Sequence, residues 1–89
     1  MSSRRVEICN QRGLHARASA AFSRMANSFD ARITVERAGI TADGKSIMEL
    51  LSLAASKGLE IEISATGPDA DAAVTALSDL VEARFGEDI

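Results

Sequence analysis

Residues 13–29 read GLHARASAAFSRMANSF, and the spacing of their apolar side chains decides the class of fold. A helix over residues 16–28 gathers these side chains into one buried stripe, because they follow the i, i+4, i+7, i+8 and i+11 pattern. The stripe comprises Ala18, Phe22, Met25, Ala26 and Phe29. Four polar residues are expected on the solvent side of this helix: Ser19, Ser23, Arg24 and Asn27. The helix therefore requires an apolar surface from the rest of the chain.

Four short segments with alternating apolar residues can supply that surface as strands. They are residues 4–10 (RRVEICN), 31–36 (ARITVE), 40–42 and 59–65 (LEIEISA). Ser46 and Glu49 form a capping-box pattern that begins a second helix, for which Gly58 after Lys57 is the expected C-cap. A third helix is expected after Pro68, with Gly86 as its stop signal. Its apolar stripe comprises Ala73, Val74, Leu77, Leu80 and Val81.

The element order is therefore β-α-β-β-α-β-α. Strands with one apolar face predict an antiparallel or mixed sheet, and three amphipathic helices can cover that face. We expect an α+β fold, a two-layer open-faced sandwich, with residues 1–89 forming a single domain.

Composition limits the classes of function. The net charge is −3 and the chain has no Trp or Tyr, which argues against nucleic acid as a partner. Cys9 is the only cysteine, so we expect no disulfide and no metal site, and a core thiol in a reducing cytoplasm. No signal peptide and no apolar run of about 20 residues is present, so membrane insertion is not expected.

Charge is unevenly distributed. Residues 1–45 contain eight Lys and Arg against four Asp and Glu, whereas residues 46–89 contain two against nine. Four of the arginines lie within the first 17 residues, as does the only histidine, His15: Arg4, Arg5, Arg12 and Arg17. Each is individually an ordinary surface residue, but as a group they would attract acidic partners or phosphate.

His15 falls at the N-terminal edge of the first predicted helix, where unpaired backbone N–H groups form an anion site. A phosphoryl group on a ring nitrogen would be stabilised there by these N–H groups and by the guanidinium of Arg17. The alternative role for His15 is that of a helix cap or surface residue. The surrounding segment contains no second histidine and no carboxylate, so neither an acid–base enzyme nor a metal site can be assembled from it.

The GLHAR segment, the KSIMELLSL segment about thirty residues later and the IEISATGPDADAAVTAL segment together resemble HPr, the histidine-containing phosphocarrier of the bacterial phosphotransferase system. The resemblance covers nearly the whole chain. It implies a four-stranded antiparallel sheet with three helices on one face. It also implies a phosphoryl carrier without a cofactor rather than a self-contained catalyst.

The resemblance implies roles for particular residues. His15 would accept a phosphoryl group at Nδ1 from enzyme I and pass it to an enzyme IIA, and Arg17 would accompany the phosphohistidine. Ser46 matches a serine that an HPr kinase/phosphorylase modifies in some bacteria, although it can equally be only a helix cap. Ile47, Met48 and Leu51 match a partner-docking patch, for which ordinary core residues are the alternative. A monomer is expected.

One departure from the family pattern concerns position 18, where alanine stands in place of the usual proline. This change removes no chemical group needed for transfer, but it loosens the first turn of the helix. Segments of the chain resemble both the nitrogen-related regulatory branch and the serine-regulated carriers, and we favour the former.

Two further hypotheses compete with the carrier. The first is a regulatory binding module in which phosphorylation of His15 or Ser46 selects the partner without onward transfer. The second is a small-molecule-binding domain with an incidental histidine, which enzyme I would not phosphorylate.

Overall fold

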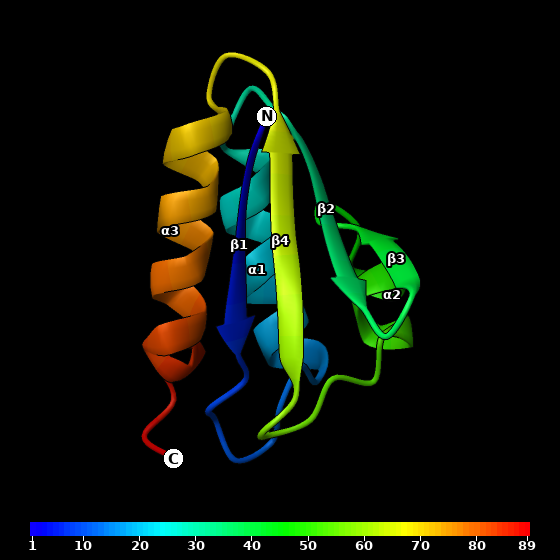
Figure 1. Cartoon of the computed structure of the whole chain (residues 1–89). Coiled ribbons are helices and arrows are strands. Elements are labelled where there is room, and N and C mark those ends of the chain that lie inside the picture. The colour runs from blue at the N-terminus through cyan, green and yellow to red at the C-terminus, as the bar shows by residue number, and fades with distance from the viewer.

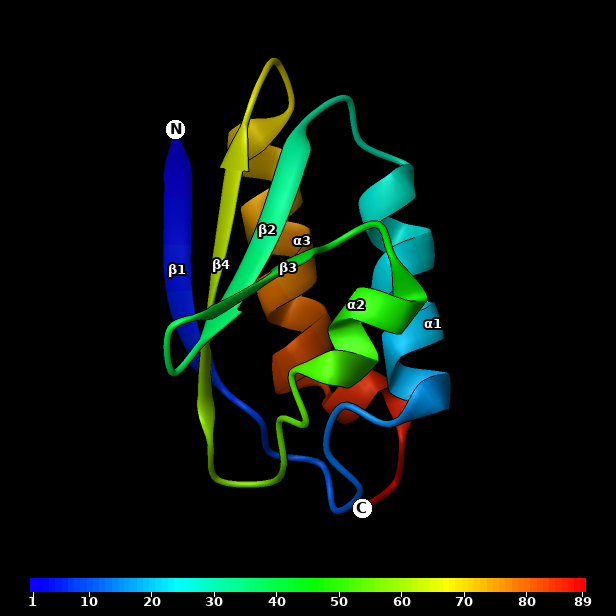
Figure 2. The ribbon, with the colours of Figure 1, turned by 90° about the vertical axis from the view of Figure 1, so that its right-hand side faces the viewer.

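The computed structural model describes residues 1–89, and its four strands form one antiparallel sheet in the order β1-β4-β2-β3. The strands are β1 (Ser2–Glu7), β2 (Arg32–Arg37), β3 (Ile40–Asp43) and β4 (Glu60–Thr66). The helices are α1 (Ala16–Asn27), α2 (Ile47–Ser52) and α3 (Ala70–Glu82), followed by a 3₁₀ turn, η1 (Arg84–Gly86). The three helices cover one face of the sheet and leave the other open, which confirms the predicted sandwich (Figure 1, Figure 2).

The core lies between the sheet and the helices, and the alternation within the strands creates it. Ile61 and Ile63 of β4 are buried on the covered face, and they pair in register with Val6 of β1 and Val35 of β2. Phe22 of α1 is completely buried against this layer, as the helical stripe predicted. No helix is both long enough and apolar enough to span a bilayer.

Two serines of α1 are buried, although the helical pattern predicts them on the solvent side. Ser19 is fully buried and Ser23 is 5% exposed. Both hydroxyls find carbonyl acceptors, because Ser19 donates to Leu14 over 3.3 Å and Ser23 donates to Lys45 over 2.9 Å. Short hydroxyl side chains can be buried in this way when each is hydrogen-bonded. Arg24 and Asn27 are exposed, as expected.

The second helix is shorter than predicted. It ends at Ser52, with Leu53 as its C-cap, and does not continue to Lys57. The core draws the following segment inward, since Leu53 and Ala55 are buried. Gly58, the expected C-cap, instead lies in a turn with φ of +92° and donates its N–H to the carbonyl of Ile8 over 2.8 Å.

The first strand and the third helix also end earlier than expected. Cys9 lies beyond β1 and is only half-buried, so it is not a core strand residue. Its thiol donates to the carbonyl of Val81 over 3.4 Å. After α3 the chain reverses through left-handed residues at Arg84 and Phe85, which places Phe85 back in the core.

Candidate functional site

His15 is the N-cap of α1, with an extended backbone conformation. Its carbonyl accepts the N–H of Ser19 over 2.8 Å, and its ring Nδ1 accepts the backbone N–H of Arg17 over 3.3 Å. The ring therefore turns Nδ1 towards the N-terminal end of the helix, where further backbone N–H groups lie unpaired. A side-chain acceptor at an N-cap normally comes from Ser, Thr, Asp or Asn, and here the imidazole takes that role.

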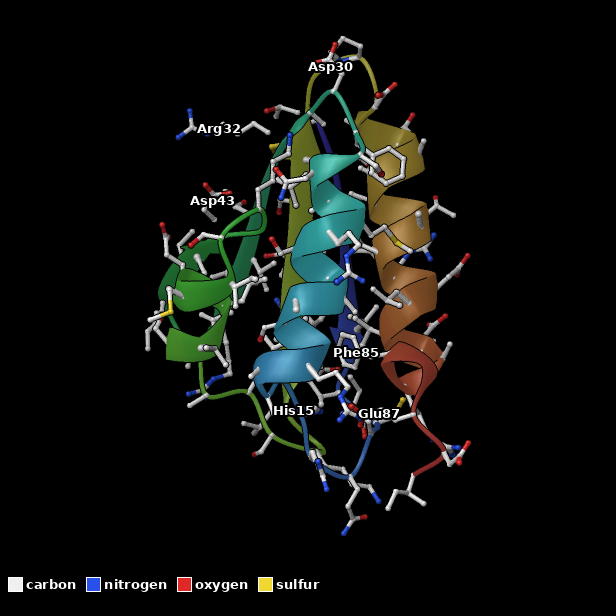
Figure 3. The ribbon with its side chains drawn as sticks, turned by 180° about the vertical axis from the view of Figure 1, so that it is seen from behind. His15, Asp30, Arg32, Asp43, Phe85 and Glu87 are labelled. Atoms are coloured by element: carbon white, nitrogen blue, oxygen red, sulfur yellow. The ribbon has the colours of Figure 1, made fainter.

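The second ring nitrogen has an acidic partner that the sequence did not suggest. Nε2 of His15 lies 2.5 Å from Oε2 of Glu87, and the two side chains are 22% and 14% exposed. Because Nδ1 accepts a hydrogen bond, the ring proton belongs on Nε2, which donates it to the carboxylate. Figure 3 shows Glu87 at the same end of the molecule as His15, below Phe85.

A buried asparagine holds Glu87 in place. Nδ2 of Asn10 donates to Oε1 of Glu87 over 3.0 Å and to the carbonyl of Gly13 over 2.8 Å. Both neighbours are acceptors, which fixes the orientation of the amide. Asn10 is fully buried, so this network is formed by the folded chain and not by mobile surface groups.

The segment around His15 contains no carboxylate, but the folded chain brings one to the ring from the segment after α3. Seventy-two positions separate His15 from Glu87. Neither helical nor strand periodicity relates residues so far apart. The only sequence signal was the Gly86 stop, after which the chain was free to turn back towards the site.

The environment of Glu87 favours its charged form. The hydrogen bond from Asn10 is the largest influence and lowers the pKa of Glu87 below its usual value of 4.5. Partial burial acts in the opposite direction, but hydrogen bonding and charge from His15 and the charge of Arg12 lower the pKa further.

The four N-terminal arginines do not gather at the site as a group. Arg12 and Arg17 line a surface hollow together with residues 85–89. Arg4 and Arg5 lie on β1, where Arg5 is 3.9 Å from Glu60 across the sheet. Two of the arginines, and not four, therefore line the hollow that also contains Glu87, the partner of His15.

The proposed docking residues and Ser46 lie together on α2, which packs beside α1 (Figure 2). Ser46 is the N-cap of α2, and its hydroxyl accepts the N–H of Glu49 over 3.3 Å. Ile47 is 41% exposed, Met48 is 75% exposed and Leu51 is half-buried. The core alternative is therefore wrong for Ile47 and Met48, since Leu50 is the buried residue of this helix.

An imidazole with an available lone pair, placed at a helix N-terminus beside an arginine, can hold a phosphoryl group and release it again. The antiparallel open-faced sandwich together with this site defines the class of phosphocarrier proteins. The family model for the HPr component phosphorylation site of the phosphotransferase system matches residues 2–83. The chain belongs to the HPr family.

Relatives of known class support the assignment to the HPr family. The phosphocarrier protein HPr of Neisseria meningitidis is 45% identical over 82 residues, with 92% of both chains covered. The phosphocarrier protein NPr of Shewanella violacea is 43% identical over 84 residues, covering 94% of this chain and 92% of the relative.

Solved structures share the same fold. An HPr structure from Thermoanaerobacter tengcongensis aligns over the whole of both chains with a TM-score of 0.96 and 42% identity. An HPr dimer from the same organism aligns over 98% of this chain and 100% of the other, with a TM-score of 0.78 and 42% identity.

Proposed function

We propose that this protein carries a phosphoryl group on Nδ1 of His15, taken from phosphorylated enzyme I and given to an enzyme IIA. The observation that carries this proposal is the orientation of the ring, which presents the Nδ1 lone pair to the N-terminal end of α1. The bond from Arg17 N–H is long at 3.3 Å, so little stabilisation is lost when Nδ1 exchanges it for phosphorus.

The transfer exchanges one nitrogen–phosphorus bond for another. The Nδ1 lone pair attacks the phosphorus of the donor phosphohistidine, and the donor nitrogen keeps the electron pair of the bond that breaks. The freed N–H of Arg17 can then donate to a phosphoryl oxygen, and the exposed guanidinium of Arg17 supplies positive charge. Transfer to enzyme IIA repeats these steps in reverse. The chain thus acts as an intermediate and requires no cofactor of its own.

Partners are proposed to dock on the α2 patch, which comprises Ile47, Met48 and Leu51. An exposed methionine suits a surface that binds more than one protein, because its side chain is flexible and polarisable. Ser46 stands at the edge of this patch, and phosphorylation by an HPr kinase/phosphorylase would place about two negative charges there. That arrangement supports a second function, in which modification selects partners without onward transfer.

The single domain over residues 1–89 is proposed to act as a monomer in the cytoplasm, since a small patch suits a transient contact. Light scattering at micromolar concentration would test the oligomeric state. A dimer mass would contradict the proposal.

A phosphoryl-transfer assay tests the function. The protein is mixed with phosphoenolpyruvate and either a sugar-type or a nitrogen-type enzyme I, and mass spectrometry measures the added phosphate. One acid-labile, base-stable phosphate is expected on the wild type and none on His15→Ala. Onward chase to an enzyme IIA supports the carrier, whereas a stable label without chase supports the binding module. If neither enzyme I labels the protein, His15 serves neither as a carrier nor as a phosphorylated switch. If both enzymes label it, the more active one identifies the branch.

A further inference from the structure

We infer that Glu87 is a positioning residue for His15, which holds the ring by its Nε2 proton and stabilises the charge that the ring acquires on phosphorylation. The inference rests on the proposed function, because it concerns the same ring. The hydrogen bond between Nε2 of His15 and the carboxylate of Glu87, on which the inference depends, can be tested without any transfer reaction.

The two ends of the ring are held by different parts of the fold. Nδ1 contacts the first turn of α1, whereas Nε2 contacts a carboxylate from the segment after α3. A ring held at both nitrogens cannot rotate freely, so the Nδ1 lone pair keeps one direction. Such fixed orientation is a large part of how proteins accelerate transfer between bound groups.

Glu87 is itself held by contacts that a freely moving tail would lack. Asn10 donates to its Oε1, and its backbone N–H donates to the carbonyl of Arg84 over 2.9 Å. Beyond it, the carbonyl of Ile89 accepts the N–H of Gln11 over 3.0 Å. The segment that carries Glu87 is thus joined to residues 10 and 11 by two hydrogen bonds, and the bond to Arg84 closes its own turn.

The backbone before Glu87 adopts an unfavourable conformation. Arg84 and Phe85 have φ values of +58° and +55°, in the left-handed region that residues with a Cβ avoid, and Gly86 follows at +82°. Strain of this kind persists only where surrounding contacts outweigh it, and it gathers at functional sites. Here the reversed turn buries Phe85 and directs Glu87 to His15.

The hydrogen bond between His15 and Glu87 becomes stronger after phosphoryl transfer, because the ring gains positive charge. The ring is neutral while Nδ1 holds a lone pair and Nε2 holds the proton. When Nδ1 shares its lone pair with phosphorus, the donor bond breaks and the ring acquires a formal positive charge, with the proton still on Nε2. The carboxylate of Glu87 then faces a cation, and interactions that strengthen along the reaction accelerate it.

The first test compares Glu87→Gln with Asp88→Asn, in the full chain. Both variants remove one negative charge, and the two positions are neighbours, but only Glu87 touches the ring. We expect Glu87→Gln to lower the kcat of phosphoryl acceptance from enzyme I about tenfold with little change in KM, the size expected for one lost charge-assisted hydrogen bond. Asp88→Asn removes a charge from the same hollow without touching the ring, so it should lower kcat by less than about twofold. Equal kcat values for Glu87→Gln and the wild type would overturn the inference.

The second test is proton NMR of the unphosphorylated protein, with circular dichroism as a check on folding. The wild type should show a low-field Nε2 proton signal from His15 that Asp88→Asn retains and Glu87→Ala loses. Absence of this signal in the folded wild type would overturn the inference even if His15 accepts phosphate. If enzyme I fails to label the wild type while the signal is present, the proposed function fails and the positioning contact stands.

Discussion

The backbone N–H of Leu14 donates to the carbonyl of Ala55 over 2.8 Å, which joins the segment before His15 to the loop after α2. The backbone at residues 13–14 approaches the backbone at residues 55–56 this closely because Gly13 has no side chain. A Cβ on Gly13 would lie 2.6 Å from the carbonyl oxygen of Ala55 and 2.8 Å from the Cα of Ser56. The site and the helix that carries the proposed docking patch are thus linked through main-chain contacts.

Gly13→Ala should destabilise the protein more than Gly58→Ala. Both glycines have positive φ, at +68° and +92°, so both variants carry left-handed strain of about 1 kcal/mol. Only Gly13 also faces backbone within 4 Å, and overpacking adds about 1–3 kcal/mol. Urea denaturation followed by circular dichroism measures both free energies of unfolding. Equal losses would show that the loop after α2 moves away without cost.

Substitutions at Ser46 should separate the helix cap from the regulatory charge. Ser46→Ala removes the acceptor for the N–H of Glu49 and should lower the free energy of unfolding by about 1 kcal/mol. Ser46→Asp keeps a good cap and should leave stability within about 0.5 kcal/mol of the wild type. Thermal denaturation checks both values.

The affinity for enzyme I should rank the two Ser46 variants in the opposite order to their stability. Ser46→Asp adds negative charge beside the patch and is expected to weaken binding, whereas Ser46→Ala is not. Calorimetry with purified enzyme I makes the comparison. Equal affinities would contradict a regulatory role for charge at this position.

Truncation of two apolar residues of α2, Met48 and Leu50, should change the stability of the protein by very different amounts. Leu50→Ala removes a fully buried side chain and should cost about 2–5 kcal/mol of stability. Met48→Ala shortens a side chain that is 75% exposed, so stability should change by less than about 0.5 kcal/mol. If the patch docks enzyme I, Met48→Ala should raise the KM for this protein in phosphoryl transfer. An unchanged KM would remove Met48 from the docking surface.

The lowered pKa of Glu87 predicts how its stabilising contribution depends on pH. Because the folded-state pKa lies below the unfolded value near 4.5, the contribution is complete above 4.5 and is lost as the pH falls through the folded-state pKa. The stability difference between the wild type and Glu87→Gln should therefore shrink on acidification from pH 7 to pH 3. A carboxyl carbon NMR titration should place the midpoint of Glu87 below 4.5. A midpoint above that value would contradict the hydrogen-bond network.

The fold could be predicted because its determinants are local. Alternation in β1, β2 and β4 identifies the buried face, and the Phe22 stripe identifies the matching face of α1. The element ends were less predictable because tertiary contacts set them. Leu53 enters the core and stops α2 well before Gly58, although nothing in the local pattern forbids another turn.

The site was predictable only in part for the same reason. The position of His15 at a helix N-terminus follows from its own segment. Its contact with Glu87 depends on a reversed turn through two non-glycine residues in the left-handed region, which sequence propensities disfavour. Likewise, the burial of Ser19 and Ser23 depends on carbonyl acceptors that only the folded chain brings near.

The long sequence separation between His15 and its carboxylate partner also orders events during synthesis. A ribosome adds Glu87 72 residues after His15, so the ring is synthesised well before its carboxylate partner. A nascent chain therefore exposes the imidazole but does not hold it in the orientation found in the folded protein. Completion of the site is coupled to completion of the fold, and an unfinished chain would be a poor substrate for any phosphoryl donor.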